Sequence, residues 1–292
     1  MNSPTSLITG ATEGVGKVTA IELAKRGFTV VIAARNADKA EALINEIEAL
    51  SGNTSCDYIV ADLESLSQVR QLAETYRHRH SALDVLINNA GVFLPSRTET
   101  EDGYETMFQV NYLAPFLLTH ELLDELRKSE QGRIINLSST VYAIGKFEPD
   151  NFQSVGVGET HFSVLGTYAA TKLFVIMFTE ELARRLNGTS VTANAVHPGI
   201  VRTRMMLRAP GIFRLVSYLS LPLSISTFQG ARTSVFLATS PEVKGISGQY
   251  FTKSKRTPVK NKFDTPENRA ALWELSLNLA EDKATTTVRQ AS

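Results

Sequence analysis

The chain has 292 residues, and its 30 lysines and arginines are balanced by 30 aspartates and glutamates, so its formal net charge is zero. This balance excludes the electrostatic case for nucleic-acid binding, which needs a clustered basic excess. Apolar residues make up 43% of the chain and charged residues 21%, which is typical of a globular protein. A single cysteine, Cys56, excludes an internal disulfide framework and a cysteine-rich zinc site.

The sequence indicates neither a targeting segment nor a membrane span. The first apolar run, Leu7 and Ile8, is too short for a signal peptide. An uncharged apolar run of about 18 residues, as a spanning helix requires, does not occur. The segment nearest to one, 205–225, is interrupted by arginines and prolines, and we interpret it as an apolar lid rather than a membrane-surface helix. We therefore expect a cytoplasmic protein with no integral membrane segment.

Short apolar runs alternate with helical patterns along most of the chain. The run Thr29–Ala34 is almost continuously apolar, as expected for a parallel strand buried on both faces. The expected strands are 6–9, 29–34, 56–61, 84–88, 133–138, 191–196 and 249–252, and the expected helices are 15–26, 37–50, 66–80, 106–128, 167–186 and 227–238. This alternation predicts an α/β fold with a doubly wound, Rossmann-type parallel sheet of about seven strands and helices on both faces.

No internal repeat or Pro/Gly/Ser-rich linker divides the chain. We expect one domain over residues 1–280 and a disordered polar tail over 281–292. Two segments, 141–166 and 203–226, break the alternation, and the second is the expected lid. Both follow strands, so they should lie at the carboxyl edge of the sheet, where such folds bind ligands.

The first expected strand leads into a glycine-rich turn, Thr9-Gly10-Ala11-Thr12-Glu13-Gly14-Val15-Gly16. Glycines let such a turn tighten and let its backbone approach a pyrophosphate, while the following helix N-terminus offers amides and a favourable dipole. An ordinary βα turn is the alternative, but the position between the first strand and the first helix favours a dinucleotide. The cofactor-binding residues expected here are Thr9, Gly10, Thr12, Gly14, Val15 and Gly16.

The end of the second strand favours NADP(H) over NAD(H). An acidic residue about 20 residues past the turn would hydrogen-bond the ribose 2′-hydroxyl of NAD, whereas Arg35 and Asn36 stand there in this chain. A guanidinium suits a 2′-phosphate, although Arg35 could also be a solvent-exposed residue at the start of a helix. After the third strand, Asp62 could accept from the adenine amine or cap the next helix, and Leu63 beside it joins the expected cofactor site.

Tyr168 and Lys172 lie four residues apart on an expected helix, so their side chains share one face. A tyrosine of ordinary pKa is a poor base at neutral pH, and a neighbouring ammonium would lower that pKa. The pair could then move a proton to or from a carbonyl or alcohol oxygen. Ser138 and Ser139 end the fifth strand, where a hydroxyl could hydrogen-bond the reacting oxygen. Taken alone, each of these patterns is commonly structural.

Further motifs follow in a fixed order. They are Asn88-Asn89-Ala90-Gly91, Asn111, Ser139, Tyr168-Ala169-Ala170-Thr171-Lys172 and His197-Pro198-Gly199-Ile200-Val201-Arg202-Thr203. Together with the glycine turn, this series resembles the short-chain dehydrogenase/reductase family in its single-domain branch, from about Leu7 to Thr252. The long interval between Ser139 and Tyr168, and Leu272-Trp273-Glu274 near the end, are similar to the retinol dehydrogenase and protochlorophyllide reductase-like group.

The resemblance implies a role for each of these residues. Tyr168 would be the general acid/base, and Lys172 would lower its pKa and hold the nicotinamide ribose. Ser139, with Ser138 as the alternative, would orient the substrate oxygen, and Asn111 would support a water-linked proton relay. The implied cofactor contacts in these motifs are Asn89, Ala90, Gly91, Tyr168, Lys172, Pro198, Gly199, Ile200 and Thr203. No cluster of side chains has metal-ligand spacing, so no metal is expected.

These observations predict an NADP(H)-dependent oxidoreductase that interconverts a carbonyl and an alcohol on a small, lipophilic substrate. The apolar lid is the reason for expecting a lipophilic substrate. The alternatives are a non-catalytic NAD(P)-binding sensor or scaffold, an epimerase or dehydratase on the same fold, and a reductase of an activated carbon–carbon double bond. By analogy with the family, helices 106–128 and 167–186 would pair copies into a homodimer or homotetramer.

Two segments near the C-terminus have less specific patterns. Lys253, Lys255, Arg256, Lys260 and Lys262 form a basic stretch. We interpret it as a solvated loop rather than a contact for anionic lipid or a partner, since the net charge is zero. Leu272, Trp273, Leu275 and Leu279 recur at helical spacing, which predicts a packing face.

Overall fold

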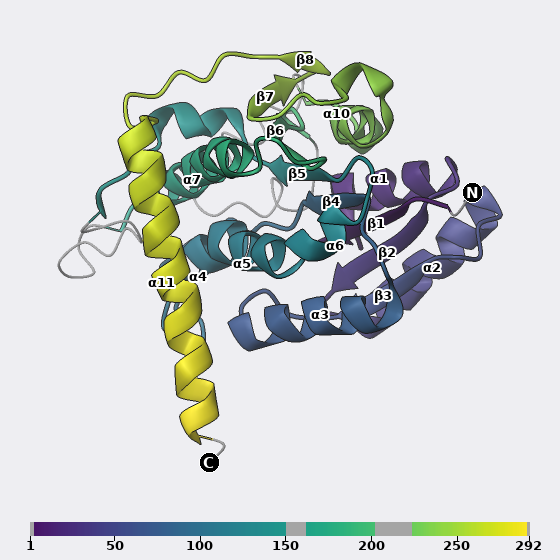
Figure 1. The fold of residues 1–292 in the computed structure, drawn as a ribbon, viewed down its shortest axis with the longest axis horizontal. Helices are drawn as coiled ribbons and strands as arrows, with labels where there is room; N and C mark the ends of the chain where they lie inside the picture. Colours follow the sequence, from purple (N-terminus) through teal and green to yellow (C-terminus); the bar gives the residue numbers. More distant parts are fainter. Residues whose placement is uncertain (1–2, 150–161, 202–223, 291–292) are drawn as a thin grey trace.

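A sheet of eight strands in the order β3-β2-β1-β4-β5-β6-β7-β8 forms the centre of the protein (Figure 1). The computed structural model describes residues 3–149, 162–201 and 224–290. The strands are β1 Thr5–Thr9, β2 Thr29–Ala34, β3 Asp57–Val60, β4 Val85–Asn88, β5 Arg133–Leu137, β6 Thr192–His197, β7 Gln249–Thr252 and β8 Lys255–Arg256. Strands β1 to β7 are parallel, and only β8 pairs antiparallel, with β7. The predicted Rossmann-type parallel sheet is therefore confirmed.

The eighth strand is the element that the sequence does not predict. It has two residues, which is too short to show a strand periodicity, and it lies inside the basic stretch. The turn before it contains Lys253 and Ser254, both in the left-handed region with φ of 49° and 59°. Glycine or asparagine is usual in that conformation, so the ordinary hairpin signal is missing from this turn.

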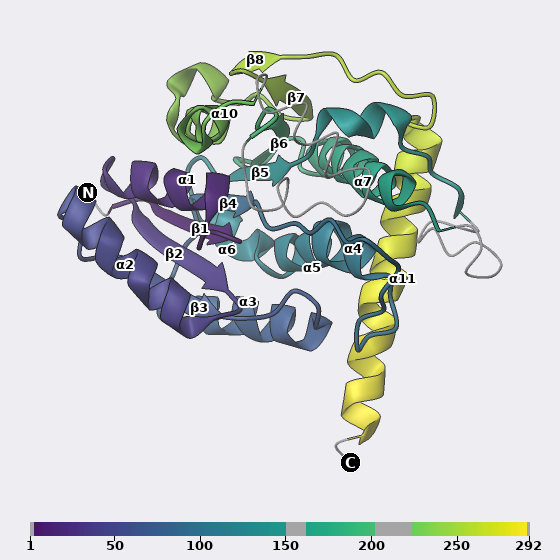
Figure 2. The same cartoon turned by 180° about the vertical axis from the view of Figure 1, so that it is seen from behind.

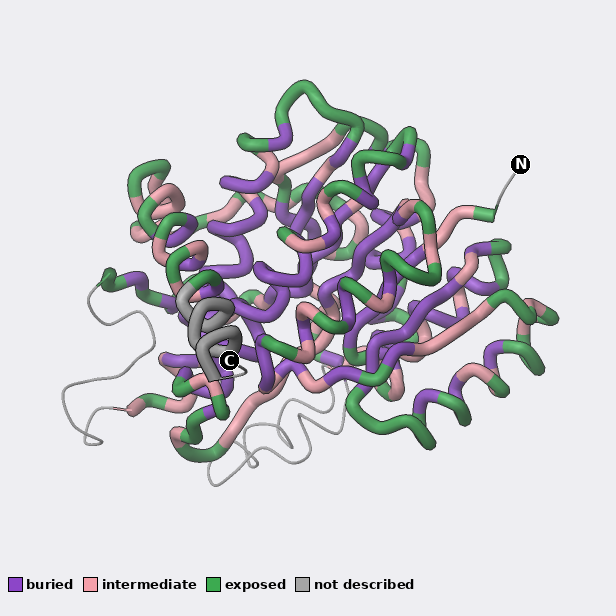
Figure 3. Tube along the Cα trace, turned by 60° about the horizontal axis from the view of Figure 1, so that its bottom comes forward, coloured by how far each residue is buried: buried purple, intermediate pink, exposed green. Residues whose placement is uncertain are grey.

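The central strands are buried along almost their whole length, and Figure 3 shows that buried chain runs through the middle of the molecule. Leu7 and Ile8 of β1 and Val31 and Ile32 of β2 have no exposed surface. Because neighbouring residues of a strand point to opposite faces, complete burial requires a layer of helices on each side.

Helices cover both faces of the sheet, as Figures 1 and 2 show from opposite sides. Two separate apolar clusters, one on each face, hold these layers to the strands. One layer contains α1 Gly14–Ala24, α2 Ala37–Ser51 and α10 Thr227–Thr239. The other contains α3 Leu66–Arg79, α4 Thr106–Phe108, α5 Ala114–Glu121, α6 Leu123–Arg127 and α7 Val164–Arg185.

The single helix predicted over 106–128 is divided. A π-helical turn, Gln109–Leu113, separates α4 from α5, and Leu122 separates α5 from α6. Pro115 explains the first division, because it has no N–H and its ring would clash with the carbonyl of Asn111, four residues earlier. The wider turn resolves this conflict, and the amide of Ala114 instead reaches the carbonyl of Gln109.

The last helix, α11 Pro266–Gln290, packs beside α7 and the helices around α5 (Figure 1). The ring of Trp273 lies 5.2 Å from the ring of Phe116 and 6.0 Å from that of Phe178, centroid to centroid. The hydroxyls of Tyr112 and Ser276 are hydrogen-bonded at 2.7 Å. These contacts form the packing face expected around Trp273. The helix continues to Gln290 and so includes most of the segment 281–292 that the sequence predicts to be a disordered tail.

The position of α11 bears on the expected pairing of copies. Phe116 on α5 and Phe178 on α7 lie on the two helices that the family analogy assigns to a homo-oligomer interface, and both contact Trp273 of the same chain. An interface built on the faces of these helices that carry Phe116 and Phe178 would therefore have to include α11 or displace it.

Loss of the Trp273 ring should destabilise the fold. We expect Trp273→Ala to lower the free energy of unfolding by about 3–5 kcal/mol, because a large buried aromatic side chain leaves a cavity when it is truncated. Urea denaturation followed by circular dichroism measures this change. Glu274→Ala is the matched control, since Glu274 is 63% exposed and only pairs with Arg185. Its cost should stay below about 1 kcal/mol, and equal costs for the two variants would contradict the packing role.

Candidate active site

A cleft of about 980 Å³ opens at the carboxyl edge of the parallel strands. The strand order reverses between β1 and β4, so the connections leaving these strands diverge to opposite faces and leave a crevice. Its walls include the glycine turn after β1, the ends of β2 and β3, the loop after β4, the end of β5, α7 and the loop after β6. Most of the sequence-predicted site residues therefore meet in one place.

The glycine turn is shaped by close approaches that leave no room for side chains. Gly10 and Gly14 both have a φ of 64°, in the left-handed region. A Cβ at Gly10 would lie 2.7 Å from the Cα of Ala90, and one at Gly16 would lie 2.6 Å from the carbonyl oxygen of Gly10. Gly10, Thr12, Gly14, Val15 and Gly16 all line the cleft.

Asn89 ties this turn to the loop after β4. Its Nδ2 donates to the carbonyls of Thr9 and Gly10 at 2.8 and 2.9 Å. The Thr9 hydroxyl oxygen in turn accepts from the amides of Asn89 and Ala90, each at 3.1 Å. Thr9 is buried and shapes the turn from behind, whereas Asn89, Ala90 and Gly91 line the cleft.

The far end of the cleft carries charged residues from α1, α2 and the β3 loop. Arg35 is 68% exposed, and its guanidinium lies 3.6 Å from the carboxylate of Glu64. Lys17 forms an ion pair with Glu46 at 2.5 Å. Lys39, which the sequence analysis does not single out, lines the same end of the cleft. Three basic side chains therefore gather where a 2′-phosphate is expected, and two of them already have carboxylate partners.

Two neighbours of this region differ from expectation. Asn36 is not among the residues that line the cleft, and its side chain caps α2 by accepting from the amide of Lys39 at 2.8 Å. Asp62 does line the cleft with Leu63, but it does not cap the next helix. Ser65 caps α3, and Asp62 accepts from the amide of Glu64 at 3.0 Å in a local turn.

Tyr168, Lys172 and Ser139 meet at the other end of the cleft. The ammonium of Lys172 lies 5.6 Å from the ring centroid of Tyr168 and donates to the carbonyl of Leu137 at 3.1 Å. Ser138 donates to the carbonyl of Lys172 at 2.7 Å and so joins β5 to α7. Ser139 is half-exposed to the cleft, which favours it over Ser138 as the hydroxyl that would meet a substrate.

Asn111 lies behind this group, in the π-helical turn. Its side chain accepts from the amide of Val92 at 2.7 Å and donates to the Val92 carbonyl at 3.0 Å. A longer bond, 3.3 Å, runs to the hydroxyl of Thr171, which itself donates to the carbonyl of Tyr168. Asn111 therefore supports the loop after β4 and the Tyr168 turn, and it does not line the cleft itself.

Burial shifts the pKa values of Tyr168 and Lys172. The shift of the Tyr168 pKa is opposite to the one that its spacing from Lys172 predicts. Removal from water raises the pKa of Tyr168 to about 12, although part of its side chain still meets the cleft. Burial also lowers the pKa of Lys172 to about 8. At neutral pH the tyrosine holds its proton and the lysine is charged. The expected lowering of the Tyr168 pKa is not seen, because desolvation by burial disfavours the charged tyrosinate.

One aromatic contact was not expected from the sequence. Phe93, two residues after the Asn-Asn-Ala-Gly motif, lines the cleft and sets the edge of its ring against that of Tyr168, with the centroids 5.1 Å apart. A phenylalanine in a loop gives no periodic signal, so only its distance from the motif could have indicated it.

The loop after β6 closes the nicotinamide end of the predicted site. Pro198, Gly199 and Ile200 line the cleft, and Gly199 has a φ of 95°. Val201 and Ile225 form an isolated parallel bridge, which brings together the two ends of the segment between them. Thr203 and residues 203–223 of the expected lid lie outside the described residues.

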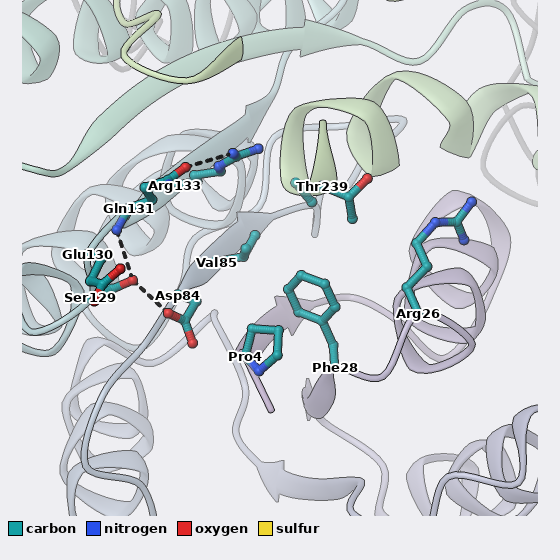
Figure 4. A pocket seen from close by; sticks show the side chains of 11 residues that line it. Pro4, Arg26, Phe28, Asp84, Val85, Ser129, Glu130, Gln131, Arg133 and Thr239 are labelled. Carbon is teal, nitrogen blue, oxygen red and sulfur yellow. Dashed lines mark hydrogen bonds between the residues drawn. The ribbon is translucent and has the colours of Figure 1, made fainter. Parts of the chain in front are cut away.

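A second hollow, of about 670 Å³, lies at the opposite, amino edge of β1, β4 and β5 (Figure 4). Its polar side chains are occupied with structural bonds. Asp84 accepts from the Thr5 amide and from the Ser129 hydroxyl, and Arg133 donates to the carbonyls of Leu237 and Ser240. It contains none of the predicted site residues, and we assign it no function.

The family can now be assigned by comparison with known proteins. The sequence model described as short chain dehydrogenase matches residues 4–148 and 151–210. The chain belongs to the short-chain dehydrogenase family. It falls in the retinol dehydrogenase-like group: it is 39% identical to retinol dehydrogenase 12 of Bos taurus, over 94% of this chain and 85% of that one. It is 38% identical to retinol dehydrogenase 14 of Homo sapiens, over 94% and 86% of the two chains.

Solved structures share the fold of this chain. An uncharacterised protein from Mycobacterium paratuberculosis superposes with a TM-score of 0.75 and 29% identity, over 95% of this chain and 93% of the other. A blue fluorescent protein from a metagenomic library, solved in complex with NADPH, gives a TM-score of 0.67 and 30% identity, over 86% and 96% of the two chains. Within the described part of this short-chain dehydrogenase, none of the helices is both long enough and apolar enough to cross a membrane.

The buried charge of Lys172 should reduce the stability of the folded protein. Between pH 8 and 10.5 the unfolded chain binds more protons at this site than the folded one, so stability rises with pH across that window. We expect Lys172→Met to raise the free energy of unfolding at pH 7 by about 1–3 kcal/mol. This gain should shrink as the pH approaches 10.5. Urea titrations at pH 7 and 9.5 measure both effects, with the exposed Lys146→Met as the control, and a gain independent of pH would contradict this origin.

Proposed function

We propose that this short-chain dehydrogenase is an NADP(H)-dependent oxidoreductase that interconverts a carbonyl and an alcohol on a lipophilic substrate, with Tyr168 as the general acid/base. The observation that carries the proposal is the meeting of Tyr168, Lys172 and Ser139 in the same cleft as the glycine turn. Family membership and the retinol dehydrogenase relatives support oxidoreductase chemistry at an alcohol carbon.

The cleft suits a dinucleotide. The bare backbone at Gly10 and Gly16, where a Cβ would collide with neighbouring chain, gives a pyrophosphate close access to the start of α1. Asn89, Ala90 and Gly91 would form the adjoining wall, and Pro198, Gly199 and Ile200 would hold the nicotinamide end. Thr203 belongs to the proposed cofactor set on sequence grounds alone. Bound NADPH would supply the hydride.

Arg35, Lys17 and Lys39 are the residues that support NADP(H) over NAD(H). Each lines the adenosine end of the cleft, and a dianionic 2′-phosphate would gain favourable interactions with them that a hydroxyl would not. Glu64 and Glu46 compete for two of the cations, so phosphate binding would have to redirect those ion pairs. The NADPH complex of the metagenomic relative is consistent with this preference.

The protonation states suit the donation of a proton to a carbonyl oxygen at neutral pH. Tyr168 holds a proton that it can donate to the oxygen of a carbonyl as negative charge develops there. Lys172 is charged at that pH, and its positive charge would stabilise the tyrosinate left behind. Ser139 would donate a hydrogen bond to the same oxygen. Asn111 supports this group through Thr171, and a water-linked relay from it stays a prediction.

Apolar side chains favour a lipophilic substrate. Phe93, Val141 and Leu165 line the cleft beside Tyr168. Ile200 at its edge is 46% exposed, and so large an exposed apolar side chain beside a cleft is suited to an apolar ligand. The relatives named as retinol dehydrogenases make all-trans-retinal the first aldehyde to test, with decanal as an unrelated lipophilic aldehyde.

Two further expectations stay proposals. A cytoplasmic location is favoured by the single cysteine, which suits a reducing compartment. Homo-oligomerisation rests on the family analogy, and the position of α11 over α5 and α7 makes sedimentation velocity the measurement that decides it. The sensor, epimerase and double-bond reductase alternatives gain no specific support from the cleft.

Removal of the Tyr168 hydroxyl should separate catalysis from cofactor binding. We expect Tyr168→Phe to lower kcat for reduction of all-trans-retinal or decanal by about 10²–10⁴-fold, because proton donation is lost. The dissociation constant for NADPH, followed by fluorescence titration, should stay within about twofold, since the ring remains. A non-catalytic sensor would show no turnover in either form, and an undiminished rate in Tyr168→Phe would exclude this tyrosine as the acid.

Reversal of the charge at position 35 should change cofactor preference. We expect Arg35→Asp to weaken NADPH binding by about 10–100-fold, since a charge-assisted contact of about 1.5–3 kcal/mol becomes a repulsion. NADH binding should weaken little or improve, which makes NADH the internal control. Salt should weaken NADPH binding to the unmodified protein more than NADH binding. An unchanged preference in Arg35→Asp would contradict the assignment of Arg35 to the 2′-phosphate.

A further inference from the structure

The basic stretch near the C-terminus contains a polar side chain, Asn261, that points inward. Residues 257–265, between β8 and α11, form a segment that we call the strap. Lys260 and Lys262 are exposed, as expected for a solvated loop, but Asn261 between them is half-buried. Its Nδ2 donates to the carbonyls of Tyr142 and Gly145, both at 2.9 Å, and to that of Ala143 at 3.3 Å.

These three carbonyls belong to the turn that Ser139 begins. Ser139 caps the short 3₁₀ helix Thr140–Ile144, and its carbonyl accepts from the amide of Tyr142 at 3.0 Å. We call residues 139–145 the serine turn. The strap contacts the Tyr142 side chain as well, because the amide of Lys260 donates to its hydroxyl at 3.2 Å.

The serine turn also rests on the helix that carries Tyr168. A Cβ at Gly145 would lie 2.5 Å from the carbonyl oxygen of Ala169, so the turn and α7 are in backbone contact one residue beyond Tyr168. The strap is fixed to α7 independently, since Asp264 pairs with Arg269 at 2.6 Å and Arg269 pairs with Glu180. The strap thus contacts the serine turn directly and is linked to α7 through Arg269 of α11.

We propose that Asn261 is a positioning residue that holds the serine turn against α7 and so places the Ser139 hydroxyl opposite Tyr168. The inference rests on the proposed function, since it needs Ser139 to act on the substrate oxygen. No part of the cleft is lined by Asn261, so its effect passes through the backbone of the turn.

The contacts at position 261 require a side-chain amide, which donates from its nitrogen and accepts at its oxygen. The Asn261 Oδ1 accepts from the amide of Phe263 at 2.8 Å, which directs Nδ2 toward the three carbonyls. Aspartate has the same shape but would set a carboxylate oxygen against those carbonyl oxygens. Asn261→Asp should therefore push the turn away, whereas Asn261→Ala only removes the bonds and serves as the milder variant if the aspartate form does not fold.

The first measurement is hydrogen exchange by mass spectrometry on the unmodified protein and its variants. We expect amides of residues 139–145 to exchange at least about tenfold faster in Asn261→Asp and Asn261→Ala, because their local opening becomes less costly. Asn268→Ala is the matched control: its Nδ2 donates to the carbonyl of Phe263 within the same region and does not touch the serine turn. Unchanged exchange in both Asn261 variants would overturn the proposal.

The second measurement is a double-mutant cycle on aldehyde reduction, with Asn261→Asp and Ser139→Ala made singly and together. We expect Asn261→Asp to lower kcat about 10–100-fold while the NADPH dissociation constant changes by less than about threefold, since misplacement of one catalytic group affects the chemical step. In the Ser139→Ala background its further effect should be less than about twofold. A merely structural role predicts equal losses in both backgrounds.

These experiments distinguish failure of the positioning role of Asn261 from failure of the proposed oxidoreductase function. If the unmodified protein turns over no aldehyde with NADPH, the oxidoreductase proposal fails and the role of Asn261 fails with it. If the unmodified protein is active but the two substitutions have independent effects, the oxidoreductase proposal stands and only the positioning role is overturned.

Discussion

The reversal of strand order between β1 and β4 is the constraint on which the rest of the structure depends. The connections that leave β1 and β4 run to opposite faces of the sheet, so they leave a crevice at the carboxyl ends of these two strands. Asn89 bridges that space with hydrogen bonds to the carbonyls of Thr9 and Gly10, which sets how far apart the two loops stand. The residues that line the cleft lie around this crevice, from Arg35 after β2 to Tyr168 on α7.

The features predicted correctly have local signals. Apolar runs gave the parallel strands, and motif spacing gave most of the residues that line the cleft. The misplaced features have causes that the motif spacing does not show. Asn36 serves α2 rather than the cleft, β8 is too short to have a pattern, and the pKa of Tyr168 reflects burial that no spacing encodes. The division at Pro115 was readable from the proline itself. Asn261 could not be found, because its partners lie over 100 residues away in the chain.

Polar side chains are buried among apolar ones beneath the cleft, and most of them form hydrogen bonds. Asn88 donates to Asn136 and Thr119, and Asn136 donates to Thr179, so a polar network links β4, β5, α5 and α7 beneath the cleft. Satisfied networks of this kind specify one arrangement of the elements that they join. Lys172 is the costly member, since its charge is held in a buried position.

The place of α11 in the chain has a consequence for biosynthesis. Phe116 and Phe178 form an aromatic surface that Trp273 covers, and Trp273 lies in a helix that is translated after both of them. While the ribosome is still making this segment, the preceding domain can form its sheet but presents that surface uncovered. Transiently exposed apolar surface promotes aggregation, so the nascent protein is more prone to aggregate until α11 has emerged. A stop codon before Pro266 would make that temporary state permanent.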